Sequence, residues 1–130
     1  MVSLRGLHPQ LRPYAEALVQ LANRDYGLRV NVTSTLRSYD QQQRLYQNYL
    51  DCKARGLAGT SVSLGAGLSC AWPANPPGQS GHNYGLAWDS TADDMATWTA
   101  LRRWAGWHVP ENDQIHAELP GWRQYVPGLT

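Results

Sequence analysis

Two residue types that bind metals stand close together in the segment 80–89, which reads SGHNYGLAWD. Asp89 ends a short predicted strand, on which alternate side chains share a face, so its carboxylate can face a site. His82 lies on the loop before that strand, and Gly81 and Gly85 remove the side chains that would obstruct a bend. The loop can therefore fold His82 back towards Asp89. The ordinary alternative is a turn histidine and a surface aspartate, and only a third ligand would decide against it.

The third ligand would come from the segment 113–118, which reads DQIHAE. His116 lies on the last predicted strand, residues 115–119. A set of His82, Asp89 and His116 would hold a tetrahedral zinc ion with one position open to water, as in catalytic rather than structural sites. Zinc lowers the pKa of such a water to about 7, which provides a nucleophile at neutral pH.

A zinc-activated water needs a proton acceptor beside it. Asp113, three residues before His116 at a predicted turn, is the first choice for this general base, and Glu111 is the alternative. Glu118 is either a hydrogen-bond partner of a ligand histidine or a solvated strand residue. Two further histidines are expected to be cap or surface residues and not ligands: His8 and His108.

The elements before the site place an arginine near it. Apolar residues recur at helical spacing over residues 9–26, and an alternating pattern over residues 28–33 predicts a strand. Ser38 and Gln41 form a capping-box pattern that starts a second helix. Arg37 therefore stands where the strand ends and the helix begins.

The second half of the chain completes the predicted architecture. A glycine- and proline-rich run, residues 53–81, predicts a long loop that can contain short strands. After the strand at residues 86–89, Ser90 or Thr91 would cap a third helix that ends at Gly106. This order of elements favours an α+β fold: a small, mainly antiparallel sheet flanked by about three helices.

Length and composition limit the classes of function. The 130 residues fit a single domain, and the net charge of +1 gives no basic field that would attract nucleic acid. No apolar run is long enough to span a bilayer, so stable membrane insertion is not expected. The first ten residues also lack the apolar segment of a signal peptide.

The two cysteines, Cys52 and Cys70, stand eighteen residues apart around a run rich in glycine and serine. They form one disulfide in an oxidising compartment or remain two free thiols, and the sequence leaves both states open. No short CxxC motif or Cys/His cluster accompanies them, so they are not expected to bind zinc.

The spacing of the two site segments is S-x-H-x-x-G-x-A-x-D over residues 80–89 and D-x-x-H over residues 113–116. This pattern resembles the family of VanY-type D-alanyl-D-alanine carboxypeptidases and phage L-alanyl-D-glutamate endolysins, zinc peptidases of the hedgehog/DD-peptidase fold. Other segments resemble the family in the same order: LHP at 7–9, VTSTLRSYDQQ at 32–42 and GW at 106–107. The resemblance covers most of the chain.

The resemblance implies roles for particular residues. A zinc ion would be bound by His82, Asp89 and His116, with Asp113 as general base. Arg37 would bind the substrate or the developing oxyanion, a role that suits its permanent charge and planar fork. The residues expected at the substrate cleft are Ser80 and Gln42.

The resemblance also implies a function. Residues 1–130 would form a single catalytic domain without a separate cell-wall-binding domain, a phage-type endolysin made in the host cytoplasm and acting as a monomer on peptidoglycan after release. The expected bond is L-alanyl-D-glutamate, because Asp113 stands where the carboxypeptidase branch usually has glutamate. The alternative is a D-alanyl-D-alanine carboxypeptidase with Arg37 on the terminal carboxylate. A non-catalytic zinc-containing binding module ranks lower, because it would not need Asp113.

Overall fold

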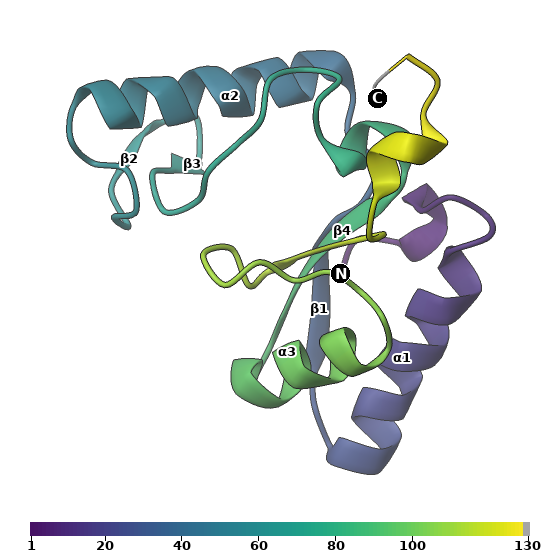
Figure 1. Ribbon diagram of the computed structural model, residues 1–130. Helices are drawn as coiled ribbons and strands as arrows, with labels where there is room; N and C mark the ends of the chain where they lie inside the picture. Colours follow the sequence, from purple (N-terminus) through teal and green to yellow (C-terminus); the bar gives the residue numbers. More distant parts are fainter. Residues whose placement is uncertain (129–130) are drawn as a thin grey trace.

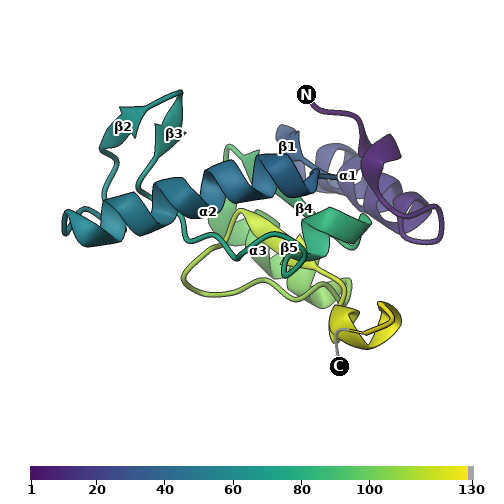
Figure 2. The same ribbon diagram turned by 90° about the horizontal axis from the view of Figure 1, so that it is seen from above.

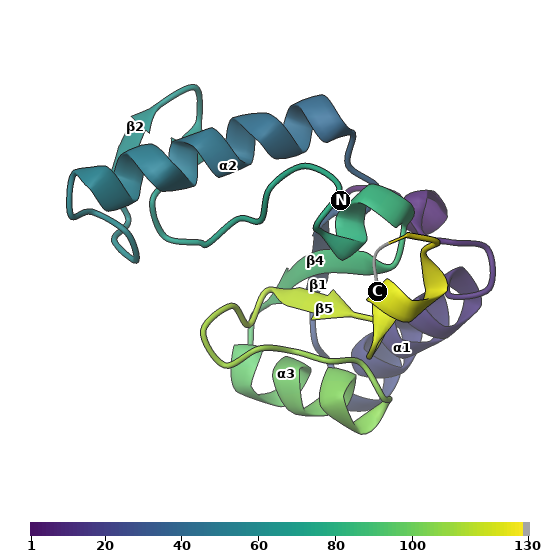
Figure 3. The same ribbon diagram turned by 45° about the horizontal axis from the view of Figure 1, so that its top comes forward.

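The computed structural model describes residues 1–128 of the 130-residue chain. Within them, α1 (Arg12–Tyr26) and α3 (Met95–Trp104) lie along one side of a three-stranded sheet, and α2 (Tyr39–Ala54) lies beyond its other side (Figure 1 and Figure 3). This arrangement confirms the predicted α+β fold. No helix in the described range combines the length and the apolar composition needed to cross a bilayer.

The sheet is antiparallel, and its register brings two predicted site residues together. From edge to edge the strands are β1 (Val30–Ser34), β4 (Ala87–Ala92) and β5 (His116–Glu118). Asp89 on β4 is paired with His116 on β5 and, on the other side, with Ser34 at the end of β1. Directly opposed residues of neighbouring strands point to the same face of a sheet. Asp89 and His116 therefore lie side by side.

A tryptophan cluster occupies the opposite face of the sheet. Trp88 is fully buried and packs edge-on against Trp98 and Trp107, with ring centroids 6.0 Å and 5.6 Å apart. Edge-to-face aromatic pairs add stability beyond the area that they bury. The buried residues of α1 join the same core: Ala15, Leu18 and Ala22. Core and site are thus separated by the alternation of side chains along β4.

The first helix begins later than predicted. It starts at Arg12 instead of near residue 9, because the preceding residues form a turn in which His8 O accepts a hydrogen bond from Arg12 N at 3.0 Å. Pro13 fits the first helical turn, where an amide hydrogen would have no helical partner. The helix ends as predicted, with Gly27 in the left-handed conformation at φ 65°.

The predicted start of the third helix is wrong. Ser90 and Thr91 belong to β4, where Thr91 pairs with β1 and the buried Ser90 hydroxyl accepts a hydrogen bond from Trp98 Nε1 at 2.9 Å. The helix is capped instead by Asp94, whose carboxylate accepts a hydrogen bond from Thr97 N at 3.1 Å. Pairing in the sheet therefore overrides the capping tendency of the two hydroxyl residues.

Residues 38–79, here called the arm, extend away from the sheet and begin with α2 (Figure 2). The predicted capping box is confirmed: Ser38 Oγ accepts a hydrogen bond from Gln41 N at 3.1 Å, and Gln41 Oε1 accepts one from Ser38 N at 2.9 Å. This fixed helix start leaves Arg37 between β1 and α2, as predicted.

The predicted loop 53–81 contains a short hairpin made of β2 (Ser63–Gly65) and β3 (Leu68–Ser69), which lies beside α2 (Figure 2). A disulfide joins Cys52 of α2 to Cys70 immediately after β3. Of the two states that the sequence left open for the cysteines, the structure has the disulfide. The hairpin is thereby tied to the helix.

Candidate metal centre and active-site cleft

The turn that carries His82 is held in place by its own side chains. Ser80 caps the 3-10 helix η2 (Gly81–Tyr84), and its hydroxyl accepts a hydrogen bond from His82 N at 3.3 Å. Gly85 ends η2 at φ 71°, and a Cβ at this position would lie 3.0 Å from Gly6 O. Glycine is therefore required where the chain turns into β4. The loop folds back over the strand as the sequence predicted.

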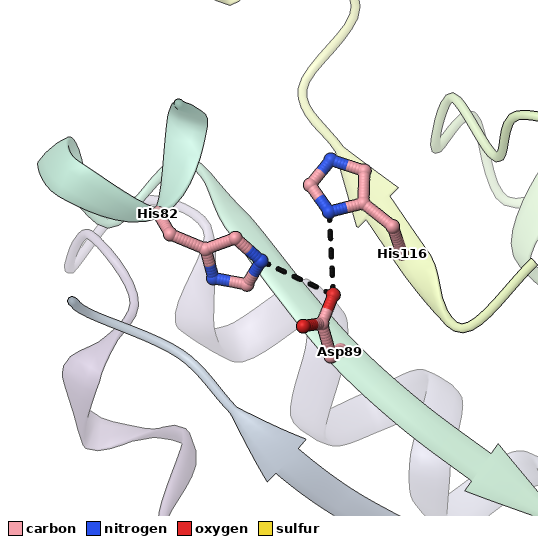
Figure 4. Close-up of side chains that lie close together, drawn as sticks. All are labelled: His82, Asp89 and His116. Carbon is pink, nitrogen blue, oxygen red and sulfur yellow. Dashed lines mark hydrogen bonds and ion pairs between the residues drawn. The ribbon is translucent and has the colours of Figure 1, made fainter. Parts of the chain in front are cut away.

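Three side chains from separate segments converge at one point (Figure 4). His82 Nε2 lies 3.1 Å and His116 Nδ1 lies 3.2 Å from Asp89 Oδ1, and one ligand atom from each residue lies within 4.8 Å of the others. Two ligands bonded to a tetrahedral zinc ion at about 2.0 to 2.1 Å are about 3.3 Å apart. The donor separations therefore fit a metal ion, and two nitrogens with one carboxylate oxygen are a set that zinc uses.

Each histidine has a hydrogen-bond acceptor beside the ring nitrogen that faces away from Asp89. His82 Nδ1 lies 2.7 Å from Thr35 O, and His116 Nε2 lies 2.7 Å from Glu118 Oε1. These oxygens accept hydrogen bonds, so these two ring nitrogens donate, and His82 Nε2 and His116 Nδ1 are the nitrogens that would present lone pairs to a metal ion after losing any proton they carry. Of the two roles considered for Glu118, the structure favours that of partner to a ligand histidine.

The group changes the proton affinities of its members. Burial alone would raise the pKa of Asp89, but hydrogen bonds from His116 and His82 outweigh it and hold that pKa well below its ordinary value. Burial would lower the pKa of His116, whereas hydrogen bonds to Asp89 and Glu118 raise it to about 9. In the metal-free protein His116 is therefore protonated at neutral pH, and a metal ion must displace that proton.

Asp113 lies beside the three converging residues and lines the same cleft. The turn that carries it is closed by a hydrogen bond from His116 N to Asp113 O at 3.1 Å. Its Oδ1 atom is buried and has no hydrogen-bond partner among residues 1–128. Burial raises the pKa of Asp113 to about 6, near the pH at which a general base is most effective. An unpaired carboxylate oxygen at this position can accept a proton.

Arg37 reaches the centre from the start of the arm. Its guanidinium donates hydrogen bonds to Asp89 Oδ2 at 3.3 Å, to Ser34 Oγ at 3.0 Å and to Gln42 Oε1 at 3.0 Å. Burial lowers the pKa of Arg37, yet an arginine remains charged at neutral pH. The cleft therefore contains a fixed cation next to the predicted metal ligands.

The cleft has a volume of about 450 Å³, and both residues predicted at the substrate lie in its wall. Ser80 is 6% exposed, and its hydroxyl is engaged by the turn of His82. Gln42 is 1% exposed and joins Arg37 to the loop above it, because its amide nitrogen donates to Asn75 O at 2.7 Å. Both side chains support the cleft, and direct contact with a substrate stays a prediction for each.

The polar residues that the sequence analysis set aside lie outside the cleft. His8 is exposed, and its Nδ1 accepts a hydrogen bond from Gln10 N at 3.1 Å, which agrees with the predicted cap role. His108 is also exposed, and its backbone pairs with that of Glu118 on β5. The alternative base, Glu111, is exposed and is not among the residues that line the cleft.

Sequence reasoning missed Arg102, a fully buried residue of α3. Its guanidinium donates to the backbone oxygens of Gln114 and Ile115, the two residues between Asp113 and His116. Burial lowers its pKa to about 10, so it remains charged at neutral pH. The sequence did contain a sign that Arg102 is buried, because residue 102 follows Trp98 by four positions and thus lies on the apolar stripe of the helix. An arginine on such a stripe needs buried acceptors.

The arrangement defines a class of site. Two ligands from a small sheet and one from the turn before β4 leave one metal position open, and a buried carboxylate and an arginine stand beside it, which fits a hydrolytic metal centre. The sequence matches the family model of VanY, D-alanyl-D-alanine carboxypeptidase, over residues 5–118. The chain therefore belongs to the VanY family and is a peptidase of the class that acts on peptidoglycan. This confirms the family that the spacing of the site segments indicated.

Solved structures share the fold at low sequence identity. The vancomycin-resistance D,D-pentapeptidase VanY of a VanB-type cassette, in complex with Zn(II), is 23% identical, with 87% of this chain and 72% of that chain covered and a TM-score of 0.57. VanYB in complex with D-alanine-D-alanine is also 23% identical; the match covers 87% of this chain and 71% of that chain, with a TM-score of 0.57. The LD-carboxypeptidase LdcB is 21% identical; the match covers 91% of this chain and 69% of that chain, with a TM-score of 0.59. A search of curated protein sequences found no significant match.

Proposed function

We propose that this protein is a zinc-dependent peptidase that cleaves the stem peptide of peptidoglycan between L-alanine and D-glutamate. The observation that carries the proposal is the convergence of His82, Asp89 and His116 beside the buried carboxylate of Asp113. Three ligands leave a position for water, and hydrolysis requires an acceptor next to that water. A binding module of the same fold would have no use for the acceptor.

Zinc is the metal that suits the donor set best. Two imidazole nitrogens and one carboxylate oxygen are ligands of catalytic zinc sites, and the related VanY structure holds Zn(II). When bound, zinc supplies Lewis-acid chemistry, because it makes a water more acidic and polarises a carbonyl. Positioning and proton transfer are then the tasks of the protein's own side chains.

Each side chain in the cleft has a task in the hydrolysis of a peptide bond. Asp113 would accept the proton of the attacking water and pass it to the departing nitrogen. Arg37 would bind the oxygen on which negative charge develops, or a carboxylate close to the bond. Gln42 would keep the guanidinium of Arg37 in place through its 3.0 Å hydrogen bond.

The choice of an internal bond is supported by the resemblance of the site segments to the endolysin branch, above all by the aspartate at position 113. A second candidate, a D,D-carboxypeptidase, is favoured by the description of the matched family and by the related structure that holds D-alanine-D-alanine. In that case Arg37 would bind the terminal carboxylate of the stem.

A defined muropeptide with a pentapeptide stem separates the candidates. Digestion by the zinc-loaded protein should release a fragment with a new N-terminal glutamate, identified by mass spectrometry. The same fragment should form when the terminal carboxylate is an amide, and a chelator should prevent its formation. Free D-alanine as the main product, lost on amidation because a buried guanidinium loses its charged partner, would identify the carboxypeptidase. A protein that binds zinc but releases no product would be the binding module.

We also propose that the protein acts as a monomer on the cell wall, after release from the cytoplasm of the cell that makes it, and without a nucleic-acid partner. The net charge of +1 supports the last point, because non-specific nucleic-acid binding needs a strongly basic surface. Sedimentation of the purified protein would test the monomer, and a second boundary at higher mass would contradict it.

A further inference from the structure

A second cavity, of about 920 Å³, adjoins the active-site cleft. It lies between the end of β1, one face of α2 and the β2–β3 hairpin, and thus largely on the arm. Four residues line both spaces: Arg37, Leu45, Asn48 and Leu68. The cleft and the second cavity are therefore neighbouring parts of one larger depression.

The two parts face different elements. The cleft is bounded by the loop 72–75 and by the segment 110–118, which carries the base and one ligand. The second cavity is bounded by the segments 33–37 and 64–68. Arg37 marks the boundary, because it lines both spaces and donates a hydrogen bond to the cleft residue Asp89. A peptide whose reacting bond lies at the metal centre can therefore continue past Arg37 into the second cavity.

The charges of the two parts also differ. Among the described residues, the second cavity is lined by two arginines and one acid: Arg37, which is ion-paired with Asp89 of the cleft at 3.3 Å, the exposed Arg44, and Asp51, which accepts a hydrogen bond from Gln47 at 3.1 Å. The cleft has three acids beside a single arginine: Asp89, Asp113 and Glu118. Leucines supply the apolar surface of the second cavity. An exposed arginine beside apolar walls suits a peptide that carries a carboxylate.

We propose that the second cavity binds the residues of the stem that follow D-glutamate, and that the exposed Arg44 binds a carboxylate on them; this inference rests on the proposed function. Cleavage between L-alanine and D-glutamate leaves several residues on the departing side, and the last of them ends in a free carboxylate. Removal of one terminal D-alanine leaves a single residue there, which is too short to extend from the metal centre past Arg37. Residues on the departing side of the reacting bond can therefore reach the second cavity only when an internal bond is cut.

The test compares two substrates, muramoyl-L-alanyl-D-glutamate, which ends at D-glutamate, and the same compound with the full pentapeptide stem. The wild-type protein should have an about tenfold lower KM for the full stem, the range of one charge-assisted hydrogen bond, with similar kcat. Arg44→Glu should raise the KM for the full stem about tenfold and leave the short substrate unchanged. A contact made equally before and in the transition state changes KM and leaves kcat unaltered.

The matched control is Arg55→Glu. Arg55 is another exposed arginine of the arm, directly after α2, and it lines neither space. This variant should keep the wild-type preference for the full stem. Equal KM values for the two substrates in the wild type, or equal effects of Arg44→Glu and Arg55→Glu, would overturn the cavity assignment while cleavage at D-glutamate stands. Release of D-alanine alone by the wild type would overturn the proposed function and this inference together.

Discussion

The body and the arm of the protein are stabilised in different ways, and the body, residues 1–37 and 80–128, has the apolar core. Trp88 and Trp98 are fully buried in it, and the face of β4 opposite the site supplies its centre. Close-packed interiors of this kind hold side chains in single positions and lose stability when volume is removed. The body is therefore a rigid support for whatever its sheet presents.

The arm, residues 38–79, depends on a crosslink and on polar contacts. Of the residues that the structure describes, none in the arm belongs to the apolar core. The disulfide between Cys52 and Cys70 ties the hairpin to α2, and Asn48 Nδ2 donates a hydrogen bond to Ser69 O at 3.1 Å across the same gap. A region with few buried apolar contacts opens at a lower free energy than a packed core.

The division between body and arm coincides with a division of tasks. The predicted ligands and base all come from the body: His82, Asp89, His116 and Asp113. The arm supplies walls of the cleft and most of the second cavity. Catalytic groups must be held within about 0.5 Å of their working positions, whereas a substrate wall tolerates more movement. Changes in the body should therefore act on kcat and metal binding, and changes in the arm should act on KM.

The largest effect is expected for Asp113→Asn. Asparagine keeps the shape of the side chain and cannot accept the proton, so kcat should fall at least about 100-fold, the low end of general acid-base contributions. Zinc content, measured by atomic absorption, should remain at the wild-type level because the three ligands are unchanged. Near-wild-type kcat would move the role of base to another residue.

A smaller loss of kcat is expected for Arg102→Met, which removes the guanidinium that holds the turn between Asp113 and His116. The backbone oxygen of Gln114 would lose its buried donor, at a cost of about 1–3 kcal/mol of unfolding free energy. A misplaced turn should also lower kcat about tenfold at temperatures where the variant is fully folded, with little change in KM. Thermal unfolding and steady-state kinetics separate the two effects.

The control for Arg102→Met is Arg103→Met on the same helix. Arg103 is exposed, and its guanidinium donates to Val109 O, outside the turn of the base. This variant should keep the wild-type kcat. If both variants lower Tm and neither lowers kcat, the role of Arg102 is confined to stability.

Removal of the disulfide tests the arm. In the double variant Cys52→Ser, Cys70→Ser, the arm should lose about 3 kcal/mol of stabilisation, the value expected for a crosslink that closes a loop of this length. The body has its own core, so zinc content and kcat should change little, and KM should rise about threefold to tenfold as the walls loosen. Hydrogen exchange should be faster in residues 38–79 alone. Loss of zinc would show that body and arm are not independent.

Sequence patterns predicted where the candidate site residues lie, because their placement depends largely on local rules. Side-chain alternation put Asp89 on one face of its strand, two glycines allowed the loop of His82 to fold back, and the capping box fixed the position of Arg37. The pairing of Asp89 with His116 and the approach of Arg37 to Asp89 are contacts distant in sequence. The first was anticipated because a metal ion requires that its ligands meet.

The error, the open choice and the missed residue all occurred where tertiary contacts decide between locally equivalent choices. Ser90, Thr91 and Asp94 are all good helix caps, and the pairing of β4 with β1 selected the last of them. The state of the cysteines depends on redox conditions as well as on the distance between Cys52 and Cys70 in the fold. The buried role of Arg102 depends on carbonyl groups that another segment brings to it.

The smallest effect is expected for Asp94→Ala, which should separate the stability of the body from its activity. Asp94 caps α3 through hydrogen bonds from Thr97 N and Thr97 Oγ1 at 3.1 Å and 2.7 Å, so the variant should lower Tm by about 4 °C at neutral pH and leave kcat and KM unchanged.

The side-chain hydrogen bond from Thr97 lowers the pKa of Asp94 below its ordinary value of 3.8. The stabilisation is therefore complete above about pH 5 and is lost as the pH falls through the lowered pKa. Asp94→Asn, which still caps, should keep Tm near the wild-type value at neutral pH. A change in kcat for Asp94→Ala would mean that small changes in the body reach the metal centre through α3.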